Sequence, residues 1–497
     1  MIHLEPIKQR TILFLIADTG AGHRSAANAI SNAIKIISQK EQEEWHAAVS
    51  ADQQGEVEGT TQLAQEAGNV ASVVSELPPS TYRIEIVDVF QEYSRFPLRE
   101  AVKLYGPAIR YNPKLYGEVF HMSNRQGPVL AAQTLASPLI LNGLVRLFTT
   151  VQPDIIVSIH PMLNHMTVRA LHQLGLHIPF LTTVTDLVSI HFMWFAEGVD
   201  GYIIPTEQAK QLYLKRGLDP ERVHMLGMPI DPKFAIPIQG KEQLQKKLGL
   251  KPGIPVVLLV GGGDGAGGLL AAVRAISQAH LPVQLMVVTG RNRRLYANLQ
   301  RSRSRLHVPA TIFGFVHNMP ELMHASDVII TKAGPGTICE ALACNLPIIL
   351  SGYVPGQEEG NVEFVTKNGV GVLALTPITL IDSLRRFIKP GSPDLLRSLE
   401  NARRLSRPGA SFDIANCILS YLPARDRQSM WESTKWQRRR RQMLGRLRSS
   451  IRLRHLPHYI PQTIPRRLPK RLLKNPIRRR QLNVHTRDIS NEGDRVV

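Results

Sequence analysis

Short apolar runs alternate with longer amphipathic segments along most of this chain. The first run, TILFLIA at 11–17, passes through a glycine turn into a segment with small and apolar residues at helical spacing. Two series of similar runs follow, at 82–90, 154–160, 179–187 and 201–206, and then at 255–268, 283–290, 310–316, 327–337 and 347–353. Apolar runs bounded by turn residues and separated by helical segments predict parallel sheets that helices cover on both faces.

The two series predict two domains. A chain of 497 residues exceeds what one hydrophobic core normally supports, and the proline-rich segment GMPIDPKF at 227–234 is typical of a linker. We therefore predict an α/β protein with two doubly wound, Rossmann-like domains, 1–230 and 231–424, which face each other across a cleft. The helical segment at 406–422 either closes the second domain or crosses back onto the first.

Two segments depart from this alternation. Residues 39–80 are rich in Gln, Glu, Ala, Gly and Ser and contain almost no large apolar residues, so we predict a flexible, solvated insertion there. Residues 127–148 are mostly apolar and belong either to the core or to a surface that faces a bilayer. No stretch reaches the roughly 18 uncharged apolar residues of a membrane-spanning helix, so we expect none.

The net charge of +20 is concentrated near the C-terminus. Residues 425–480 contain 19 Lys and Arg but two acidic residues, a net +17, so the rest of the chain is nearly neutral. We predict a basic, largely irregular tail at 425–497, in which 435–454 has partial helical patterning with apolar residues such as Trp436. This composition favours an anionic membrane surface as the partner of 425–480, while a nucleic-acid arm and an inert linker remain open.

Three cysteines, Cys339, Cys344 and Cys417, provide no disulfide framework, and none lies in a CxxC pair. A reducing compartment fits this usage. Together with the basic tail, it predicts a cytoplasmic protein that is peripheral on the inner face of the membrane.

Three glycine-rich turns each lie between a predicted strand and a helix: DTGAGH at 18–23, GGGDGAGG at 261–268 and KAGPGT at 332–337. Backbone N–H groups in such a turn can bind a phosphate, although these turns also use glycine for geometry alone. The sequence contains no GxxxxGK[ST] loop and no DxD pair, which disfavours kinases and metal-dependent sugar transfer. The first turn continues as GAGHRS, with Arg24 and Ser25 where a GxGxxG turn would have its third glycine, which disfavours dehydrogenases. Leaving-group stabilisation by helix N-termini, without a metal or other cofactor, is compatible with the turns.

Four side chains are candidates for chemistry in the first domain. His23 ends the first glycine turn, where its imidazole could take a proton from an acceptor hydroxyl or could only cap the helix. Asp186, His191 and Trp194 lie in TVTDLVSIHFMWF, at the end of the strand predicted at 179–187. Asp186 either orients a catalytic histidine or caps a turn, and Trp194 either stacks on a substrate or belongs to the core.

Taken together, these segments resemble the monogalactosyldiacylglycerol synthase family of GT-B glycosyltransferases. They are more distantly similar to the peptidoglycan N-acetylglucosaminyltransferase that shares this fold. The resemblance covers roughly residues 11–375 and rests on DTGAGHRSAANAI, VTDLVSIHFMWF, GGGDGAGG and above all the run at 314–361, which ends in PGQEEGN. In the first of these motifs Ala21 stands where the family usually has glycine.

The resemblance implies an inverting, metal-independent transfer of galactose or glucose from UDP-galactose or UDP-glucose to diacylglycerol. It assigns the lipid to the N-terminal domain and the UDP-sugar to the C-terminal domain. His23 matches the general base and Trp194 an acceptor-side aromatic, and we add Asp186 as a second catalytic candidate. Gly20, Gly22 and His191 complete the acceptor-side candidates.

On the donor side, the resemblance assigns the ribose hydroxyls to Glu340, the uracil to the backbone at Val316, and the sugar and diphosphate to Gln357, Glu358 and Asn361. The remaining donor-side candidates come from the glycine turns of the second domain and face the diphosphate: Gly261, Gly262, Gly263, Lys332, Gly334, Gly336 and Thr337. The family implies no metal ligand among them.

Two other functions remain open at this point. A UDP-sugar 2-epimerase of the same fold would need no acceptor, although the DTGAGH and PGQEEGN matches count against it. A nucleic-acid-binding protein would use the basic tail and keep the nucleotide site for regulation. Nothing in the sequence resembles a structured nucleic-acid module, so we rank this reading last.

Overall fold

The computed structural model describes residues 9–18, 21–58, 78–261 and 268–424, together with Trp431 and Trp436. All of them lie in one compact unit, Met1–Gln437, and Arg438–Val497 forms a second unit. The predicted tail at 425–497 lies outside the described residues, apart from these two tryptophans. The same is true of residues 59–77 and of the candidates Gly20, Gly262 and Gly263.

The first sheet contains six parallel strands in the order β2-β1-β3-β4-β5-β6. Its strands are β1 (Arg10–Ile16), β2 (Tyr82–Asp88), β3 (Ile155–Ser158), β4 (Phe180–Thr183), β5 (Gly201–Ile204) and β6 (Val223–Met225). Strands β1, β3, β4 and β5 are buried along their whole length, as expected for a sheet covered on both faces. The order reverses beside β1, which is where doubly wound sheets bind ligands.

Helices of this domain connect the strands, and five of them lie between β2 and β3. The helices up to residue 215 are α1 (Ala21–Glu58), α2 (Val89–Tyr93), α3 (Leu98–Lys103), α4 (Tyr105–Tyr111), α5 (Pro113–Ser123), α6 (Gln126–Val151), α7 (Asn164–Leu174) and α8 (Glu207–Lys215). The five between β2 and β3 are α2 to α6. Short 3₁₀ turns are η1 (Pro161–Leu163), η2 (Phe192–Trp194), η3 (Pro220–Arg222) and η4 (Pro232–Phe234).

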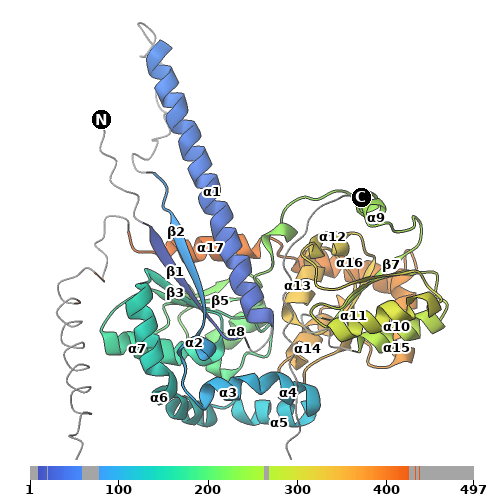
Figure 1. Ribbon diagram of the computed structural model, residues 1–497, viewed down its shortest axis with the longest axis horizontal. Helices are drawn as coiled ribbons and strands as arrows, with labels where there is room; N and C mark the ends of the chain where they lie inside the picture. Colours follow the sequence, from blue (N-terminus) through green and yellow to red (C-terminus); the bar gives the residue numbers. More distant parts are fainter. Residues whose placement is uncertain are drawn as a thin grey trace, which may run out of the picture. The chain divides into compact units, whose positions relative to one another are not determined.

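Helix α1 corrects the prediction for residues 39–80. It runs without a break for 38 residues, about 57 Å at the usual helical rise, and Figure 1 shows it continuing beyond the strands of the sheet. Residues 39–58 are therefore helical rather than a flexible loop. Ala, Gln, Glu and Lys are strong helix formers, so a segment without large apolar residues can still continue a helix that the core has already nucleated.

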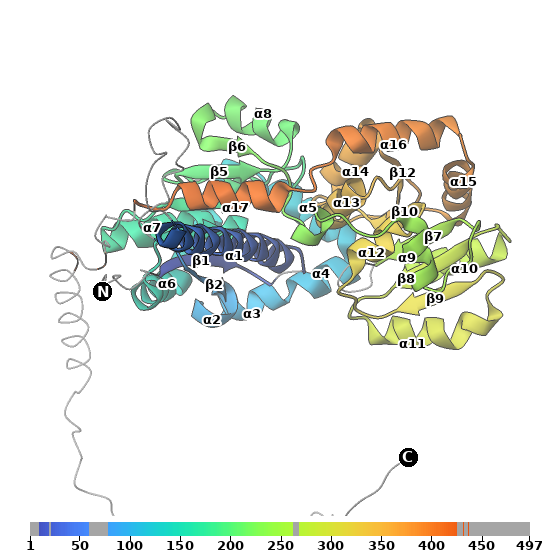
Figure 2. The same ribbon diagram turned by 90° about the horizontal axis from the view of Figure 1, so that it is seen from above.

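Helix α17 (Ala410–Ser420) corrects the predicted domain boundary. It belongs to the first domain, because Ile414, Ala415 and Ile418 are buried with Ile30 and Ile34 of α1 against the first sheet. Figures 1 and 2 both show α17 beside α1. The chain thus crosses back after completing the second domain, instead of ending there at 424.

Helix α6 also differs from expectation. By length and composition alone, this helix could cross a membrane, and a third of its most apolar 18 residues are buried. The prediction that no segment is long and apolar enough to span a membrane is therefore wrong. Leu144, Leu147 and Phe148, in the second half of the helix, are completely buried and belong to the core. Leu130 and Leu135, in the first half, are 47% and 78% exposed.

The second sheet also contains six parallel strands, in the order β12-β11-β10-β7-β8-β9. Its strands are β7 (Val256–Val260), β8 (Gln284–Val288), β9 (Ala310–Phe313), β10 (Val328–Lys332), β11 (Ile348–Gly352) and β12 (Gly371–Leu373). Its helices are α9 (Lys241–Lys247), α10 (Leu269–Gln278), α11 (Arg293–Ser302), α12 (Met319–His324), α13 (Pro335–Ala343), α14 (Glu359–Lys367), α15 (Pro377–Ile388) and α16 (Pro393–Leu405), with the 3₁₀ turn η5 (Arg303–Arg305).

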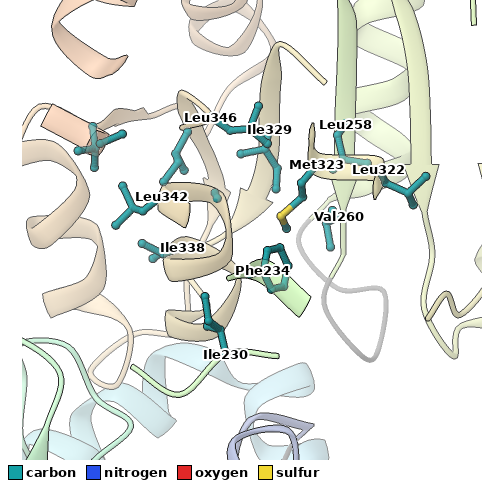
Figure 3. Close-up of a cluster of buried hydrophobic side chains, with 14 of the residues drawn as sticks. Ile230, Phe234, Leu258, Val260, Leu322, Met323, Ile329, Ile338, Leu342 and Leu346 are labelled. Atoms are coloured by element: carbon teal, nitrogen blue, oxygen red, sulfur yellow. The ribbon is translucent and has the colours of Figure 1, made fainter. Parts of the chain in front are cut away.

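One core cluster of the second domain fixes helix α13. Figure 3 shows Ile338 and Leu342 of α13 in the same cluster of buried side chains as Phe234, Leu258 and Val260. Phe234 comes from the proline-rich segment at 227–234, whose Ile230 is buried in the same cluster. Because its inner face is packed in this way, α13 holds its N-terminus in one place at the carboxyl edge of the sheet.

The two described tail residues correct one further prediction. Trp436 is 3% exposed and its ring packs against Trp431, with the centroids 5.2 Å apart. The indole N–H of Trp431 donates a hydrogen bond to the carbonyl of Pro153 at 3.0 Å. Trp436 is therefore packed against protein, and its side chain is not available for the membrane contact that the sequence pattern suggested.

Candidate active site

His23 lies in the first turn of α1, just beyond the carboxyl end of β1, and its side chain is half-buried. Its Nδ1 is 3.4 Å from the hydroxyl of Thr185, which follows β4. Burial lowers the pKa of His23 to about 4, although a backbone hydrogen bond at Ile159 and the charge of Asp18 oppose this shift. The imidazole is therefore neutral at physiological pH and able to accept a proton.

His160 is a neighbour that the sequence reasoning missed. Its ring meets the edge of the His23 ring, with the centroids 4.8 Å apart, and it is 5% exposed. Its Nδ1 has no hydrogen-bond partner among the described residues. Burial, and then the proximity of His23, lower the pKa of His160 well below its usual value. The signal was available, because His160 follows β3 at the same sheet edge as His23.

Asp186 follows Thr185 but does not orient a histidine. Its carboxylate accepts a hydrogen bond from the indole N–H of Trp194 at 2.6 Å, and no hydrogen bond from Asp186 to a histidine occurs in the described part of the chain. Burial, and the negative charge of Glu358, raise the pKa of Asp186 to about 6. Trp194 itself is completely buried. Its ring is therefore core, and the predicted stacking on an acceptor is wrong for this structure.

His191 is also a structural residue rather than an exposed acceptor contact. It is 6% exposed, its Nδ1 accepts a hydrogen bond from the backbone N–H of Met193, and its Nε2 lies 3.3 Å from the hydroxyl of Ser123. Both ring nitrogens are thus engaged, and the residue ties η2 to helix α5. Gly22, in contrast, is exposed in the first turn of α1, where it leaves open space around the helix N-terminus.

The donor half of the site is built on the turn between β10 and α13. Gly334 is the residue before the helix, and Gly336 and Thr337 form its first turn. The helix N-terminus points its backbone N–H groups out of this turn, which suits an anion such as a diphosphate. Asn361, which is 3% exposed, donates its amide N–H to the carbonyl of Ala333 at 2.9 Å and so holds the turn from behind.

Lys332 and Glu358 form an ion pair beside this turn. The side chain of Glu358 is 7% exposed, and its second oxygen accepts a hydrogen bond from the backbone N–H of Val354 at 2.9 Å. Glu358 therefore fixes both the lysine and the loop that follows β11. The negative charge of Glu358 also contributes to the raised pKa of Asp186, in the segment beside His23.

Glu340 lies in α13 about one turn after Gly336 and is half-buried. Burial, and then the charge of Asp231, raise the pKa of Glu340 to about 7. A carboxylate in this position can accept hydrogen bonds from two neighbouring hydroxyls, as the ribose assignment requires. A strongly perturbed acid next to an anion-binding turn is typical of a functional site.

The other donor-side candidates surround this turn. Gly261 is buried at the end of β7 and donates its N–H to the carbonyl of Val288 at 3.3 Å. Val316 is half-buried in the segment after β9 and packs against the core cluster of α13. Gln357 accepts a hydrogen bond from the hydroxyl of Tyr116 at 3.1 Å, a contact that crosses from the second domain to the first.

Comparison with known proteins decides the family. Residues 69–230 match the family model for monogalactosyldiacylglycerol (MGDG) synthase, and residues 256–408 match the C-terminal domain of glycosyltransferase family 28. The chain is 34% identical over 421 residues to a probable monogalactosyldiacylglycerol synthase 2, chloroplastic, of Oryza sativa subsp. japonica, across 82% of this chain and 80% of that protein. The chain belongs to the monogalactosyldiacylglycerol synthase family. It is therefore a glycosyltransferase.

Other comparisons agree with this assignment. Monogalactosyldiacylglycerol synthase 3, chloroplastic, of Arabidopsis thaliana is 34% identical over 422 residues, which is 82% of this chain and 81% of the relative. The crystal structure of Acinetobacter baumannii MurG covers 83% of this chain and 99% of its own with a TM-score of 0.50 at 13% identity, which concerns the fold alone. The predicted GT-B fold of two Rossmann-like domains is confirmed.

Within this member of the synthase family, the structure groups some of the predicted residues in two clusters. His23, Thr185 and His160 form the first, and Lys332, Glu358 and the N-terminus of α13 form the second. Asp186 lies between them. Trp194, His191 and Asn361 instead support these clusters from buried positions.

Proposed function

We propose that this chain transfers galactose or glucose from the corresponding UDP-sugar to the free hydroxyl of diacylglycerol, with inversion at the anomeric carbon. One observation carries the proposal. His23, which burial keeps neutral, lies 3.4 Å from the hydroxyl of Thr185 in the first domain. The Lys332–Glu358 pair of the second domain is near enough for the charge of Glu358 to raise the pKa of Asp186, the next residue after Thr185. The names of the relatives, as synthases of monogalactosyldiacylglycerol, support this acceptor and favour galactose.

In the proposed step, the imidazole of His23 takes the proton of the acceptor hydroxyl. The hydroxyl oxygen bonds to the anomeric carbon while the bond from that carbon to the diphosphate oxygen breaks, and UDP leaves. Asp18 stabilises the imidazolium that forms, because its charge opposes the lowering of the pKa of His23. Asp18 is held in turn by Arg24, whose guanidinium donates to both carboxylate oxygens at 2.7–3.0 Å.

The leaving diphosphate gains one further negative charge, which the second domain can stabilise. Lys332 supplies a cation, and the first turn of α13 supplies backbone N–H groups. We propose that the transfer needs no metal ion, because these groups can stabilise the negative charge of the leaving diphosphate in place of a bound cation. Turnover that survives an excess of chelator supports it, and turnover restored only by added magnesium or manganese contradicts it.

The acceptor is a lipid, and we propose that the region from α3 to α6 meets the membrane that contains it. In this region and just before it, five Phe, Leu and Met side chains are more than half exposed: Phe96 (76%), Leu104 (65%), Leu115 (52%), Met122 (62%) and Leu135 (78%). Exposed basic residues lie among them: Arg95, Arg99, Lys103, Lys114 and Arg125. Apolar side chains interspersed with cations suit the interface of an anionic bilayer. Docking through residues 425–480 and a cytoplasmic location stay predictions.

The test is product formation from UDP-galactose and UDP-glucose, measured in parallel with diacylglycerol in anionic liposomes. Liposomes without diacylglycerol serve as the control. A glycolipid formed from one donor supports the proposal and identifies the sugar. Release of UDP without a glycolipid contradicts the acceptor and favours the epimerase reading, and folded protein without any turnover contradicts the proposal as a whole.

A further inference from the structure

Helix α5 of the first domain contacts the loop of the second domain that carries Gln357 and Glu358. We call residues 354–361 the donor loop. The hydroxyl of Tyr116 donates a hydrogen bond to Oε1 of Gln357 at 3.1 Å, and both side chains are half-buried. Neither the family resemblance nor the proposed mechanism gives Tyr116 a role.

Two glycines show that the approach between helix and loop is tight. A Cβ on Gly117 would lie 2.8 Å from the Cβ of Pro355 and 3.2 Å from its backbone carbonyl carbon. Gly356 has φ +76°, and a Cβ there would lie 2.9 Å from the ring of Phe120. The backbones can come this close because both positions lack a side chain.

Glu359 closes the donor loop and joins it to the same helix. One of its carboxylate oxygens accepts a hydrogen bond from the backbone N–H of Gly356 at 2.8 Å, and the other lies 3.1 Å from Nε2 of His121. The end of α5 is fixed separately, because the Asn124 side chain accepts a hydrogen bond from the backbone N–H of Phe192 at 2.7 Å. The donor loop therefore rests on a helix that is itself held in place.

We propose that Tyr116 is a positioning residue for the donor sugar: it fixes the carboxamide of Gln357 and thereby the direction of the hydrogen-bond donors that meet the sugar hydroxyls. The inference rests on the proposed function, in which the donor loop reads the sugar. A carboxamide held at its oxygen presents its two N–H donors in one direction. Hexose epimers differ in the direction of a single hydroxyl, so this direction decides which donor is preferred.

The first test compares the binding of UDP-galactose and of UDP to the full chain carrying Tyr116→Phe, by calorimetry. The substitution keeps the ring and removes the hydrogen bond, so we expect about fivefold weaker binding of UDP-galactose and unchanged binding of UDP, which lacks the transferred hexose. The preference between UDP-galactose and UDP-glucose in kcat/KM should shrink by a similar factor. Tyr111→Phe, at a side chain that is 82% exposed, is the matched control.

Two outcomes would overturn this inference: unchanged affinities, or an equal loss for UDP and UDP-galactose, which would assign Tyr116 a structural role. Binding is measured without diacylglycerol. A wild-type protein that binds UDP-galactose yet makes no glycolipid therefore contradicts the proposed transfer, while the comparison with Tyr116→Phe still decides the inference.

The second test displaces the loop without weakening the helix. Gly117→Ala places a methyl group against Pro355, whereas alanine is the better helix former, so the thermal midpoint should stay the same or rise. We expect UDP-galactose to bind about tenfold more weakly, since one misplaced contact can have a large effect on a preorganised site. Gly127→Ala in α6, where a Cβ would meet nothing within 4 Å, is the control. Wild-type affinity in Gly117→Ala would contradict the proposal.

Discussion

The two halves of the site use different electrostatics. The cluster around His23 is formed by imidazoles that burial keeps neutral, with the pKa of His23 lowered to about 4. The cluster around Lys332 is formed by charges: an ion pair, a helix N-terminus, and Glu340, whose pKa is raised to about 7. The first half suits the uptake of a proton from a neutral hydroxyl, and the second suits a leaving group that becomes more negative.

This difference explains why the connection between the halves matters. Glu358 raises the pKa of Asp186, so the charges of the donor half reach the segment that positions His23. Thr185, the residue before Asp186, has its hydroxyl 3.4 Å from Nδ1 of His23. Substitutions around His23 should therefore affect proton uptake, and substitutions around Lys332 should affect stabilisation of the leaving group. Substitution of Asp186 should affect both stability and turnover.

The largest effect should come from His23→Ala. General-base catalysis is usually worth a factor of 10² to 10⁴, so we expect kcat to fall by about 10³ while the affinity for UDP stays within twofold. Turnover is measured with saturating donor in diacylglycerol liposomes, and UDP binding by calorimetry. A kcat within tenfold of wild type would remove His23 as the base.

On the donor side, Lys332→Met should weaken UDP binding by about 30-fold, because a cation beside the diphosphate is lost. It also leaves the buried carboxylate of Glu358 unpaired, so the free energy of unfolding should fall by about 2–3 kcal/mol. Adding Glu358→Gln should restore the stability but not the binding. If the double variant recovers both, Lys332 acts through Glu358 and not on the nucleotide.

Substitutions of exposed leucines should weaken membrane binding in the first domain but not in the second. Leu135→Glu, on the exposed face of α6, should weaken binding to anionic liposomes by about tenfold, since one leucine is worth about 1.5 kcal/mol when buried in an apolar phase. Leu396→Glu in α16 of the second domain, at a residue that is 56% exposed, is the matched control. Equal binding of both variants in a flotation assay would contradict the proposed membrane surface.

Glu340 gives a pH-dependent test of the donor half. With its pKa near 7, the carboxylate is ionised at pH 8 and protonated at pH 6, so UDP-galactose should bind more weakly as the pH falls through 7, by up to about tenfold. Glu340→Gln should bind weakly at both pH values, without this dependence. A wild-type affinity that is constant between pH 8 and pH 6 would show that the ionised form is not needed.

The smallest change in stability is expected for Asp186, the residue after Thr185. Burial raises its folded pKa to about 6 from 3.8, so the ionised form destabilises the protein above pH 6, and this cost disappears as the pH falls towards 4. Asp186→Asn keeps an acceptor for Trp194. It should therefore be more stable than wild type by about 1 kcal/mol at pH 8, allowing for partial exposure, and equally stable near pH 4. Denaturant titrations at the two pH values measure this difference.

The turnover of Asp186→Asn shows whether Asp186 contributes to the reaction or only supports the structure. Functional sites commonly sacrifice stability, so we expect the more stable variant to be about tenfold slower. A variant that gains stability and keeps full activity would show that Asp186 only supports Trp194.

Much of the fold could be predicted because its strands are buried on both faces. Ten apolar runs correspond to strands, whereas β6 and β12 were missed. Each of these is a three-residue strand at the edge of its sheet, too short for a pattern. The sequence could not decide which domain the last helix packs against, because it shows that α17 is apolar but not which sheet it covers. Helix α1 beyond residue 38 was missed because its stability depends on helix propensity, which is a weaker signal than periodicity.

Site residues could be predicted from the sequence where they come directly after a predicted strand. His23 and the turn at 332–337 lie at carboxyl ends of parallel strands, as expected for a ligand site. His160 has the same position but was read only as the end of a strand. Contacts that depend on tertiary packing gave no local signal: Tyr116 and Gln357 are 241 residues apart. The burial of Trp194 is of the same kind, because an exposed aromatic and a core aromatic look alike in sequence.

In the proposed transfer, a base from one half of the site and leaving-group stabilisation from the other act in a single displacement. The most direct test is the anomeric configuration of the glycolipid formed from UDP-α-galactose or UDP-α-glucose, read from the proton coupling at the anomeric carbon by NMR. A single displacement inverts the anomeric carbon, so we expect a β-linked product. An α-linked product would contradict it, because retention requires a second displacement or a front-side mechanism in which His23 is not the base.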